Sequence, residues 1–233
     1  CVLGLNDEPV TIRQVELAII EKAFALGLLA PAPPATRSGR SVAVVGSGPA
    51  GLAVADGLNR RGHEVRVYEN APRPGGVLRY GIPEFRLPDE VIDAEVENLK
   101  NLGVQVECNT LVGRLFTLEH MVGELGFDAV FVGTGAGTPR FMNIPGEYLN
   151  GVLSANELLT RCNLMKAGDF PNHDTPLGLG KRVAVIGAGN TAMDALRVSL
   201  RLGAERVMCV YRRTFEESPA RLEEIEHAEE EGV

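Results

Sequence analysis

The chain has 233 residues, enough for two compact units of about 100 to 150 residues each. Hydrophobic residues make up 45% and charged residues 23%, which excludes a disordered or fibrous protein. The formal net charge of −8 argues against a nucleic-acid-binding surface. No uninterrupted apolar stretch reaches the ~18 residues of a membrane span. We therefore expect a soluble cytoplasmic protein that binds neither nucleic acid nor a membrane.

The predicted elements begin with a helix over residues 10–28, where apolar residues recur every three or four positions and Thr11 and Gln14 stand at capping-box spacing. Three prolines within 30–40 then predict a stiff, extended linker. The elements that follow alternate between strand and helix: a strand at 41–46, a helix at 49–61, a strand at 63–69, a helix at 88–102, and strands at 104–109 and 128–135.

This strand–glycine turn–helix–strand pattern occurs twice. Residues 181–190 (KRVAVIGAGN) resemble residues 41–50 (SVAVVGSGPA), and residues 204–213 resemble the strand at 63–69. Two such units predict two nucleotide-binding modules. A glutamate-rich helix is expected over residues 218–232, after which the second module lacks the strands that would complete its sheet. We interpret the sequence as a piece of a longer protein.

The first glycine turn, Gly46, Gly48 and Gly51, has the pattern GxGxxG between a strand and a helix. Its first glycine permits the tight turn, the second lets backbone approach a pyrophosphate, and the third lets helix and strand pack closely. Glu69 ends the next strand, where an acid accepts hydrogen bonds from ribose hydroxyls. The turn therefore predicts a dinucleotide site, which includes Ser47, Pro49 and Ala50.

Two further glycine-rich segments favour FAD over NAD at this first site. Gly75 and Gly76 lie in a loop after the second strand, and Gly133, Thr134 and Gly135 follow another strand. Both segments suit the larger cofactor, although an ordinary loop remains the alternative for the Gly75–Gly76 pair.

The second glycine turn has the pattern GxGxxA, formed by Gly187, Ala188, Gly189, Asn190, Thr191 and Ala192. The following strand ends with Arg212 and Arg213, where an NAD site usually carries an acid. Arginines pair with a 2′-phosphate, and Arg221 is close enough in sequence to join them. We therefore favour NADP(H) over NAD(H), with solvated arginines on a turn as the alternative.

Several runs together resemble one family of flavoproteins across essentially the whole chain; they are CVLGLNDEPVTIRQVE, GSGPAGLAVADGLNRRGHEVRVYE, LRYGIPEFRLP, FVGTGAGTPRFMNIPGE, SANELLTRCNLMKA, and YRR followed by SPARLEEIEHAEEEGV. The family is that of the glutamate synthase small subunit. Within this family, the runs GIPEFRLP and FMNIPGE favour the branch that contains the large, FAD-bearing subunit of NADH-dependent ferredoxin:NADP oxidoreductase. The resemblance implies an α/β fold with two Rossmann-like, three-layer modules, one for FAD and one for NAD(P).

The domains that the resemblance implies follow one another along the chain: 1–29, the end of a helical iron–sulfur domain; 30–40, a linker; 41–150, an incomplete FAD-binding domain; 151–180, a connection; and 181–233, an incomplete NADP(H)-binding domain.

The resemblance also assigns residues. FAD is expected at the first turn, Glu69, Gly76, Val77 and Arg86, with backbone from Val112; NADP(H) is expected at 188–191, Arg212 and Arg213, with Arg221 in a looser match. Cys1 matches the last cysteine of a 4Fe-4S cluster motif, and Glu16 falls where relatives supply a non-cysteine ligand. By composition alone, Glu16 is a solvent-facing helix residue.

The expected function is that of an oxidoreductase that passes electrons between NADP(H) and FAD, and on to iron–sulfur centres, ferredoxin or a partner subunit. We assign no catalytic side chain. A flavin disulfide reductase needs a redox-active cysteine pair, whereas Cys1, Cys108, Cys162 and Cys209 lie far apart. The non-enzyme alternative is a nucleotide-binding fragment or subunit without turnover.

Overall fold

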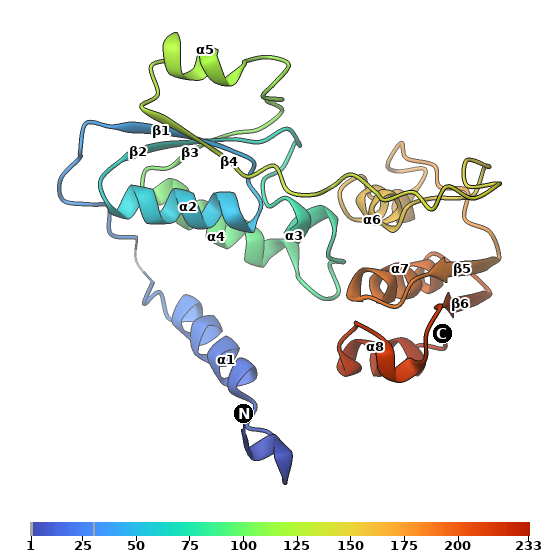
Figure 1. Ribbon diagram of the computed structural model, residues 1–233. Helices are drawn as coiled ribbons and strands as arrows, with labels where there is room; N and C mark the ends of the chain where they lie inside the picture. Colours follow the sequence, from blue (N-terminus) through green and yellow to red (C-terminus); the bar gives the residue numbers. More distant parts are fainter. Residues whose placement is uncertain (1, 30) are drawn as a thin grey trace. The chain divides into compact units, whose positions relative to one another are not determined.

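The computed structural model describes residues 2–29 and 31–233. The chain divides into two compact units, Cys1–Pro33 and Pro34–Val233. The second unit contains two parallel sheets flanked by helices, which confirms the predicted α/β class (Figure 1). Within the described residues, no helix is both long and apolar enough to cross a membrane.

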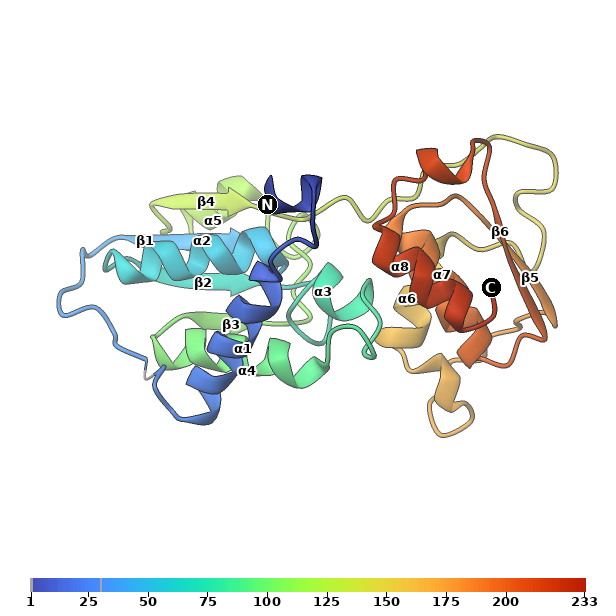
Figure 2. The ribbon, with the colours of Figure 1, turned by 90° about the horizontal axis from the view of Figure 1, so that it is seen from below.

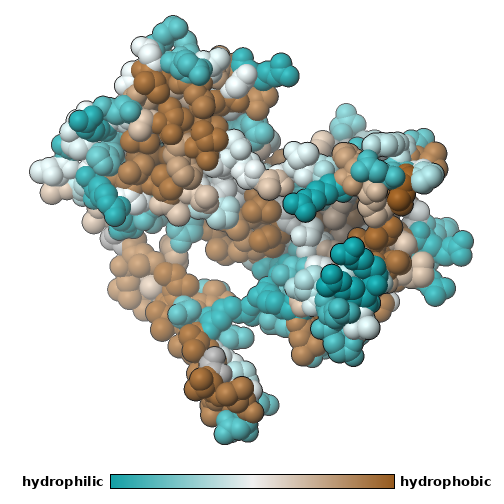
Figure 3. Space-filling view, viewed as in Figure 1, coloured by the Kyte–Doolittle hydropathy of each residue, from teal (hydrophilic) through white to brown (hydrophobic). Residues whose placement is uncertain are grey.

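The first unit consists of a short 3-10 helix, η1 (Val2–Leu5), and the helix α1 (Ile12–Ala25). Thr11 is the N-cap of α1, but its side chain makes no capping hydrogen bond, so the predicted capping box does not form. No residue of α1 is buried, and its apolar side chains are visible at the surface (Figure 3). The predicted cluster ligand Cys1 lies outside the described residues.

The end of the predicted linker is fixed to the second unit. Arg37 Nη1 donates a hydrogen bond to the His63 carbonyl at 3.2 Å, and Ser38 N donates to the Gly62 carbonyl at 2.9 Å. The Ser38 hydroxyl also lies 2.7 Å from His63 Nδ1. These bonds hold the chain just before the first strand.

The first sheet contains four parallel strands, β1 (Ser41–Val45), β2 (Glu64–Tyr68), β3 (Gln105–Glu107) and β4 (Ala129–Val132), in the order β3-β2-β1-β4. The chain moves outward from β1 through β2 to β3 and then returns to the other side of β1 at β4. The connections at the carboxyl ends of β1 and β4 therefore lead to opposite sides, and such a switch point is where open parallel sheets bind ligands.

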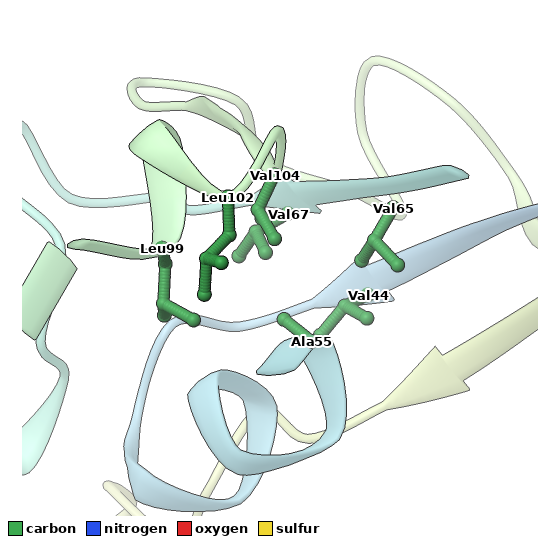
Figure 4. Packing of buried hydrophobic residues seen from close by; sticks show 7 residues of the cluster. All are labelled: Val44, Ala55, Val65, Val67, Leu99, Leu102 and Val104. Atoms are coloured by element: carbon green, nitrogen blue, oxygen red, sulfur yellow. The ribbon is translucent and has the colours of Figure 1, made fainter. Parts of the chain in front are cut away.

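Helices cover both faces of this sheet. Helices α2 (Pro49–Arg60) and α4 (Asp89–Asn101) lie on one face, and α5 (Leu118–Gly123) lies on the other (Figures 1 and 2). The core beside α2 and α4 is an apolar cluster of seven residues: Val44, Ala55, Val65, Val67, Leu99, Leu102 and Val104 (Figure 4).

Because successive strand residues point to opposite faces, β1 contributes to two cores. Val44 belongs to the cluster beside α2, whereas Ala43 and Val45 belong to the cluster beside α5. In the latter, the Tyr68 ring meets Phe116 and Phe127 edge to face, with centroids 6.2 and 6.1 Å away. Burial on both faces explains the continuous apolar run in the sequence.

The second sheet pairs β5 (Arg182–Ile186) with β6 (Arg206–Val210) in parallel. Helix α7 (Asn190–Arg201) joins the strands and packs with α8 (Leu222–Glu230) around buried residues that include Met193, Leu196 and Ile225. The predicted helix at 218–232 thus begins four residues late, because Ser218 has extended backbone after a short 3-10 helix, η3 (Phe215–Glu217).

Three smaller elements complete the second unit: α3 (Val77–Tyr80) follows β2 in the first module, whereas α6 (Ala155–Asn163) and the 3-10 helix η2 (Ala167–Asp169) lie between β4 and β5. Ser154 caps α6 by accepting a hydrogen bond from Glu157 N at 3.1 Å. Asn163 Nδ2 donates to the Tyr80 carbonyl at 3.2 Å, and this bond fastens α6 to the end of α3.

Leu102 is the residue at which the first core is easiest to test, because its side chain is only 1% exposed. We expect Leu102→Ala to lower the free energy of unfolding by about 2–5 kcal/mol through the cavity it leaves. Leu115→Ala is the matched control, since Leu115 is 62% exposed, and it should change that free energy by less than about 0.5 kcal/mol. Urea unfolding of both variants measures the difference.

Candidate functional site

The two glycine turns have the same backbone geometry. Gly46 N donates to the Tyr68 carbonyl at 2.8 Å, and Gly187 N donates to the Val210 carbonyl at 2.9 Å. Both glycines have positive φ, +100° and +125°, which L side chains rarely adopt. Each turn thus starts from a hydrogen bond to the end of the neighbouring strand and leads directly into a 12-residue helix, α2 or α7.

Close backbone packing explains two of the three glycines in the first turn. A Cβ added to Gly51 would overlap the Gly46 carbonyl oxygen, and a Cβ added to Gly46 would overlap the Gly133 carbonyl oxygen. Gly48 differs, because its backbone is extended and an added Cβ would meet no atom within 4 Å. Gly48 therefore leaves an open space at the N-terminus of α2, where unpaired N–H groups favour phosphate.

The two other segments predicted for FAD lie against this turn. A Cβ on Gly76 would come within 2.7 Å of the Gly48 Cα, so the backbones of the two segments touch. Gly133 N donates to the Val45 carbonyl at 2.8 Å and places Thr134 beside Gly46. The structure thus brings together residues 46–51, 75–77 and 133–135 at the carboxyl end of β1.

A buried carboxylate organises the first turn. Glu69, 3% exposed, accepts hydrogen bonds from Ser47 N at 2.9 Å, from the Ser47 hydroxyl, and from Ala71 N at 2.8 Å. The Ser47 hydroxyl in turn accepts from Gly75 N at 3.0 Å. Sequence analysis missed this role of Ser47, whose only local signal was a hydroxyl residue inside a glycine turn.

The remaining residues that the resemblance assigned to FAD lie at different places. Val77 is the first residue of α3 and is exposed. Val112 packs at the edge of the core beside α5. It lies two residues after Thr110, whose N–H donates a hydrogen bond to the Glu69 carbonyl at 2.8 Å. Arg86 lies against two carboxylates of the second module, Asp194 and Glu224. Contact of Val77, Arg86 or Val112 with FAD stays a prediction.

A loop packs over the second glycine turn. The Ala188 carbonyl accepts hydrogen bonds from the Ser218 hydroxyl at 2.8 Å and from Ala220 N at 3.2 Å. Asn190 Oδ1 accepts from Arg221 N at 3.0 Å. The loop over residues 218–221 therefore holds Arg221 next to the turn, although 31 residues separate it from Asn190 in sequence.

The three predicted phosphate-binding arginines differ in how they are held. Among the residues that the structure describes, the Arg212 guanidinium has no partner, and Arg213 makes only a 4.0 Å ion pair with Glu217. Both are exposed at the carboxyl end of β6. Arg221 is half-exposed and pairs with Glu224 at 3.0 Å. Arg212 and Arg213 are therefore available to an anionic ligand without first losing a strong ion pair.

The three cysteines that the structure describes do not form a redox pair. Cys108, Cys162 and Cys209 are free thiols, and burial raises the pKa of each, that of Cys162 to about 11. Since the thiolate is the reactive form, none of these three is activated at neutral pH. Across residues 2–29 and 31–233, no group of three or more His, Cys, Asp or Glu side chains is arranged to hold a metal ion, and Glu16 is exposed on α1.

The sequence matches the family model of pyridine nucleotide-disulphide oxidoreductases over residues 40–233. The chain belongs to this family. It is also 43% identical, over 208 residues, to a glutamate synthase (NADPH) small chain of Mycobacterium tuberculosis, covering 88% of this chain and 42% of that protein. The corresponding Escherichia coli protein is 39% identical, covering 98% of this chain and 49% of that protein.

These similarities confirm the predicted resemblance to glutamate synthase small subunits. The finer placement with ferredoxin:NADP oxidoreductase stays a prediction. The chain spans about half the length of these curated relatives.

Solved structures of other oxidoreductases share the fold. FprA of M. tuberculosis in complex with NADPH superposes with a TM-score of 0.66 and 26% identity, over 83% of this chain and 48% of that one. Thioredoxin reductase of Lactococcus lactis is more distant, with a TM-score of 0.52 and 20% identity, over 81% of this chain and 60% of that one. It supports the fold alone.

The glycine packing predicts that alanine destabilises one position of the first turn much more than another. Gly51→Ala should lower the free energy of unfolding by at least about 2 kcal/mol, because its Cβ has no room beside the Gly46 carbonyl. Gly48→Ala, the matched control, should cost less than about 1 kcal/mol, since its Cβ enters open space. Urea unfolding of the flavin-free protein compares them, and equal losses would contradict this packing.

Proposed function

We propose that the complete protein is an FAD-dependent NADPH oxidoreductase that passes electrons to a redox partner. The observation that carries this proposal is the difference between its two dinucleotide turns. The first is surrounded by extra glycine-rich backbone and a buried acid, Glu69, whereas the second is followed by exposed arginines. The family membership and the NADPH complex of FprA support the same conclusion.

The first turn fits FAD. The open space at Gly48 lies at the N-terminus of α2 and beside Gly76, so backbone N–H groups face a place for a pyrophosphate. In the proposed complex, residues 46–51 bind the pyrophosphate, Glu69 lies near the ribose, and residues 75–77 and 133–135 flank the cofactor. Glu69 Oε1 accepts one hydrogen bond, from Ala71 N, and keeps a lone pair for a hydroxyl.

The second turn fits NADP(H). Gly187 and Gly189 shape the turn, Ala188 to Thr191 lie at the N-terminus of α7, and Arg212 and Arg213 stand at the end of β6. A 2′-phosphate adds about two negative charges that cations must meet, and a guanidinium donates two parallel hydrogen bonds to phosphate. Arg221, fixed beside Asn190, is the third candidate.

FAD, when bound, supplies an acceptor for the hydride of NADPH and a donor of single electrons. The described residues bind and orient both nucleotides, and none of them is needed as an acid or base. The acceptor beyond the flavin is part of the proposal: a partner subunit, as the relatives' designation as small chains suggests, or ferredoxin. The 4Fe-4S cluster with Cys1 and Glu16, and a cytoplasmic location, stay predictions from the sequence.

A visible spectrum tests the proposed function. The purified full-length protein should show flavin absorption bands that bleach when NADPH is added without oxygen. A colourless protein, or bands that NADPH leaves unchanged, would favour the alternative of a nucleotide-binding subunit without turnover.

The arginines after β6 predict nucleotide preference. In Arg212→Asp with Arg213→Ala, we expect kcat/KM for flavin reduction by NADPH to fall at least about tenfold, because charge-assisted hydrogen bonds to phosphate contribute about 1.5–3 kcal/mol each. NADH has no 2′-phosphate and should be affected little. Stopped-flow reduction of the flavin with each nucleotide measures the ratio.

Arg206→Ala is the control for this double variant, because Arg206 is the first residue of β6 and lies at the other end of this strand from Arg212 and Arg213. It should leave the ratio of NADPH to NADH unchanged. An unchanged ratio in the double variant as well would mean that Arg212 and Arg213 form a solvated turn.

A further inference from the structure

We infer that Arg86 is a positioning residue, which holds the nicotinamide-nucleotide module against the loop that flanks the flavin. This inference rests on the proposed function, because positioning matters only if hydride passes between the two modules. It gives Arg86 a role other than the FAD contact that the resemblance implied.

Arg86 joins three segments that are far apart in sequence. Its Nη1 donates to both carboxylate oxygens of Asp194, at 2.7 Å each, and its Nη2 donates to Oε1 of Glu224. Asp194 lies on α7 and Glu224 on α8, and their side chains are 5% and 6% exposed. Burial raises the pKa of Asp194 above its ordinary value, although the Arg86 guanidinium acts in the opposite direction. A charge pair this well buried needs both of its members.

The residue before Arg86 completes the contact. The Phe85 ring lies beneath two guanidinium groups of α7, with its centroid 4.6 Å from Arg197 Cζ and 3.8 Å from Arg201 Cζ. Arg197 pairs in turn with Glu231 at 2.8 Å, and the two arginines lower the pKa of Glu231 to about 2. The contact thus combines ion pairs from one guanidinium to two carboxylates with an aromatic surface, which defines an orientation better than a single charge pair does.

On the second module, the contact reaches the nucleotide turn. Asp194 lies one helical turn after Asn190, the first residue of α7. Glu224 Oε1 accepts from Arg221 Nη2 at 3.0 Å as well as from Arg86, and Arg221 N donates to Asn190 Oδ1. Arg86 is therefore bonded to a carboxylate that also holds a predicted 2′-phosphate arginine.

On the first module, the loop that carries Arg86 is anchored. The loop begins at Gly76, which touches Gly48, and the buried Arg79 pairs with Asp89 at 3.1 Å and with Asp93 at 2.5 Å. Arg86 N itself donates to the Pro83 carbonyl at 2.9 Å. Because both ends of the contact are fixed, Arg86 transmits the position of the flavin loop to α7 and α8.

Hydride transfer depends steeply on the distance and orientation of donor and acceptor. If the Arg86 contact sets the orientation of the modules, weakening it should slow flavin reduction while each nucleotide still binds. A flavin ligand would behave differently, since its loss releases FAD. A contact that only stabilises the fold would lower stability without changing the limiting rate.

The test uses the full-length flavoprotein with Asp194→Asn, a nearly isosteric change that removes the charge opposite Arg86, and with Arg86→Met. We expect stoichiometric FAD and an NADP⁺ dissociation constant within about threefold of wild type. The limiting rate of flavin reduction at saturating NADPH should fall at least about tenfold. In the flavin-free protein, amide hydrogen exchange over residues 82–87 should accelerate.

The control is Arg60→Met, which removes an exposed arginine and should change none of these quantities. Within residues 2–29 and 31–233, the only ion pair of Arg60 is with Asp56 on its own helix. Restoration of the limiting rate in Arg86→Asp combined with Asp194→Arg would support the inference directly.

An unchanged limiting rate in Asp194→Asn, or loss of FAD from either variant, would overturn the inference. Failure of NADPH to reduce the wild-type flavin would instead overturn the proposed function, so the two failures are distinct.

Discussion

Backbone-to-backbone packing around Gly46 is the constraint on which the first module depends. The Gly46 carbonyl leaves no room for a side chain on Gly51, and the Gly133 carbonyl leaves none on Gly46. These contacts bring the ends of β1 and β4 together with the start of α2. The candidate FAD site therefore follows from the absence of side chains, because only bare backbone can come so close from three segments.

Charge organises the site around this backbone. Glu69 is buried, but it accepts hydrogen bonds from two residues of the chain, Ser47 and Ala71, so its burial is compensated. In the second module, Arg212 and Arg213 remain exposed and weakly paired. The proposed FAD site thus offers a carboxylate for hydroxyl groups, and the proposed NADP(H) site offers cations for an additional phosphate, although both turns have the same local geometry.

Side-chain contacts, in addition to the connecting chain, join the two modules. Arg86 of the first module pairs with carboxylates of α7 and α8 that are largely shielded from water, and Phe85 lies against two arginines of α7. Low exposure makes such ion pairs less sensitive to salt and more dependent on geometry than surface pairs. Under the proposed function, in which hydride passes between two bound nucleotides, the relative position of the modules matters as much as either site.

The sequence by itself determined the two strand–turn–helix units, both glycine turns and the arginines after β6, because these depend on residues within about 25 positions of one another. It placed α2 and α4 to within about one residue, since local apolar spacing decides a helix. The predictions of a capping box at Thr11 and of a helix start at residue 218 were wrong, because each feature depends on side-chain or backbone geometry that residue type alone does not fix. Only the tertiary structure decided that Ser47 links Glu69 to Gly75 and that Arg86 meets Asp194, 108 residues away. The physical reason is that the sequence contains many carboxylates with which a long charged side chain such as Arg86 could pair, and only the packing of the modules selects among them.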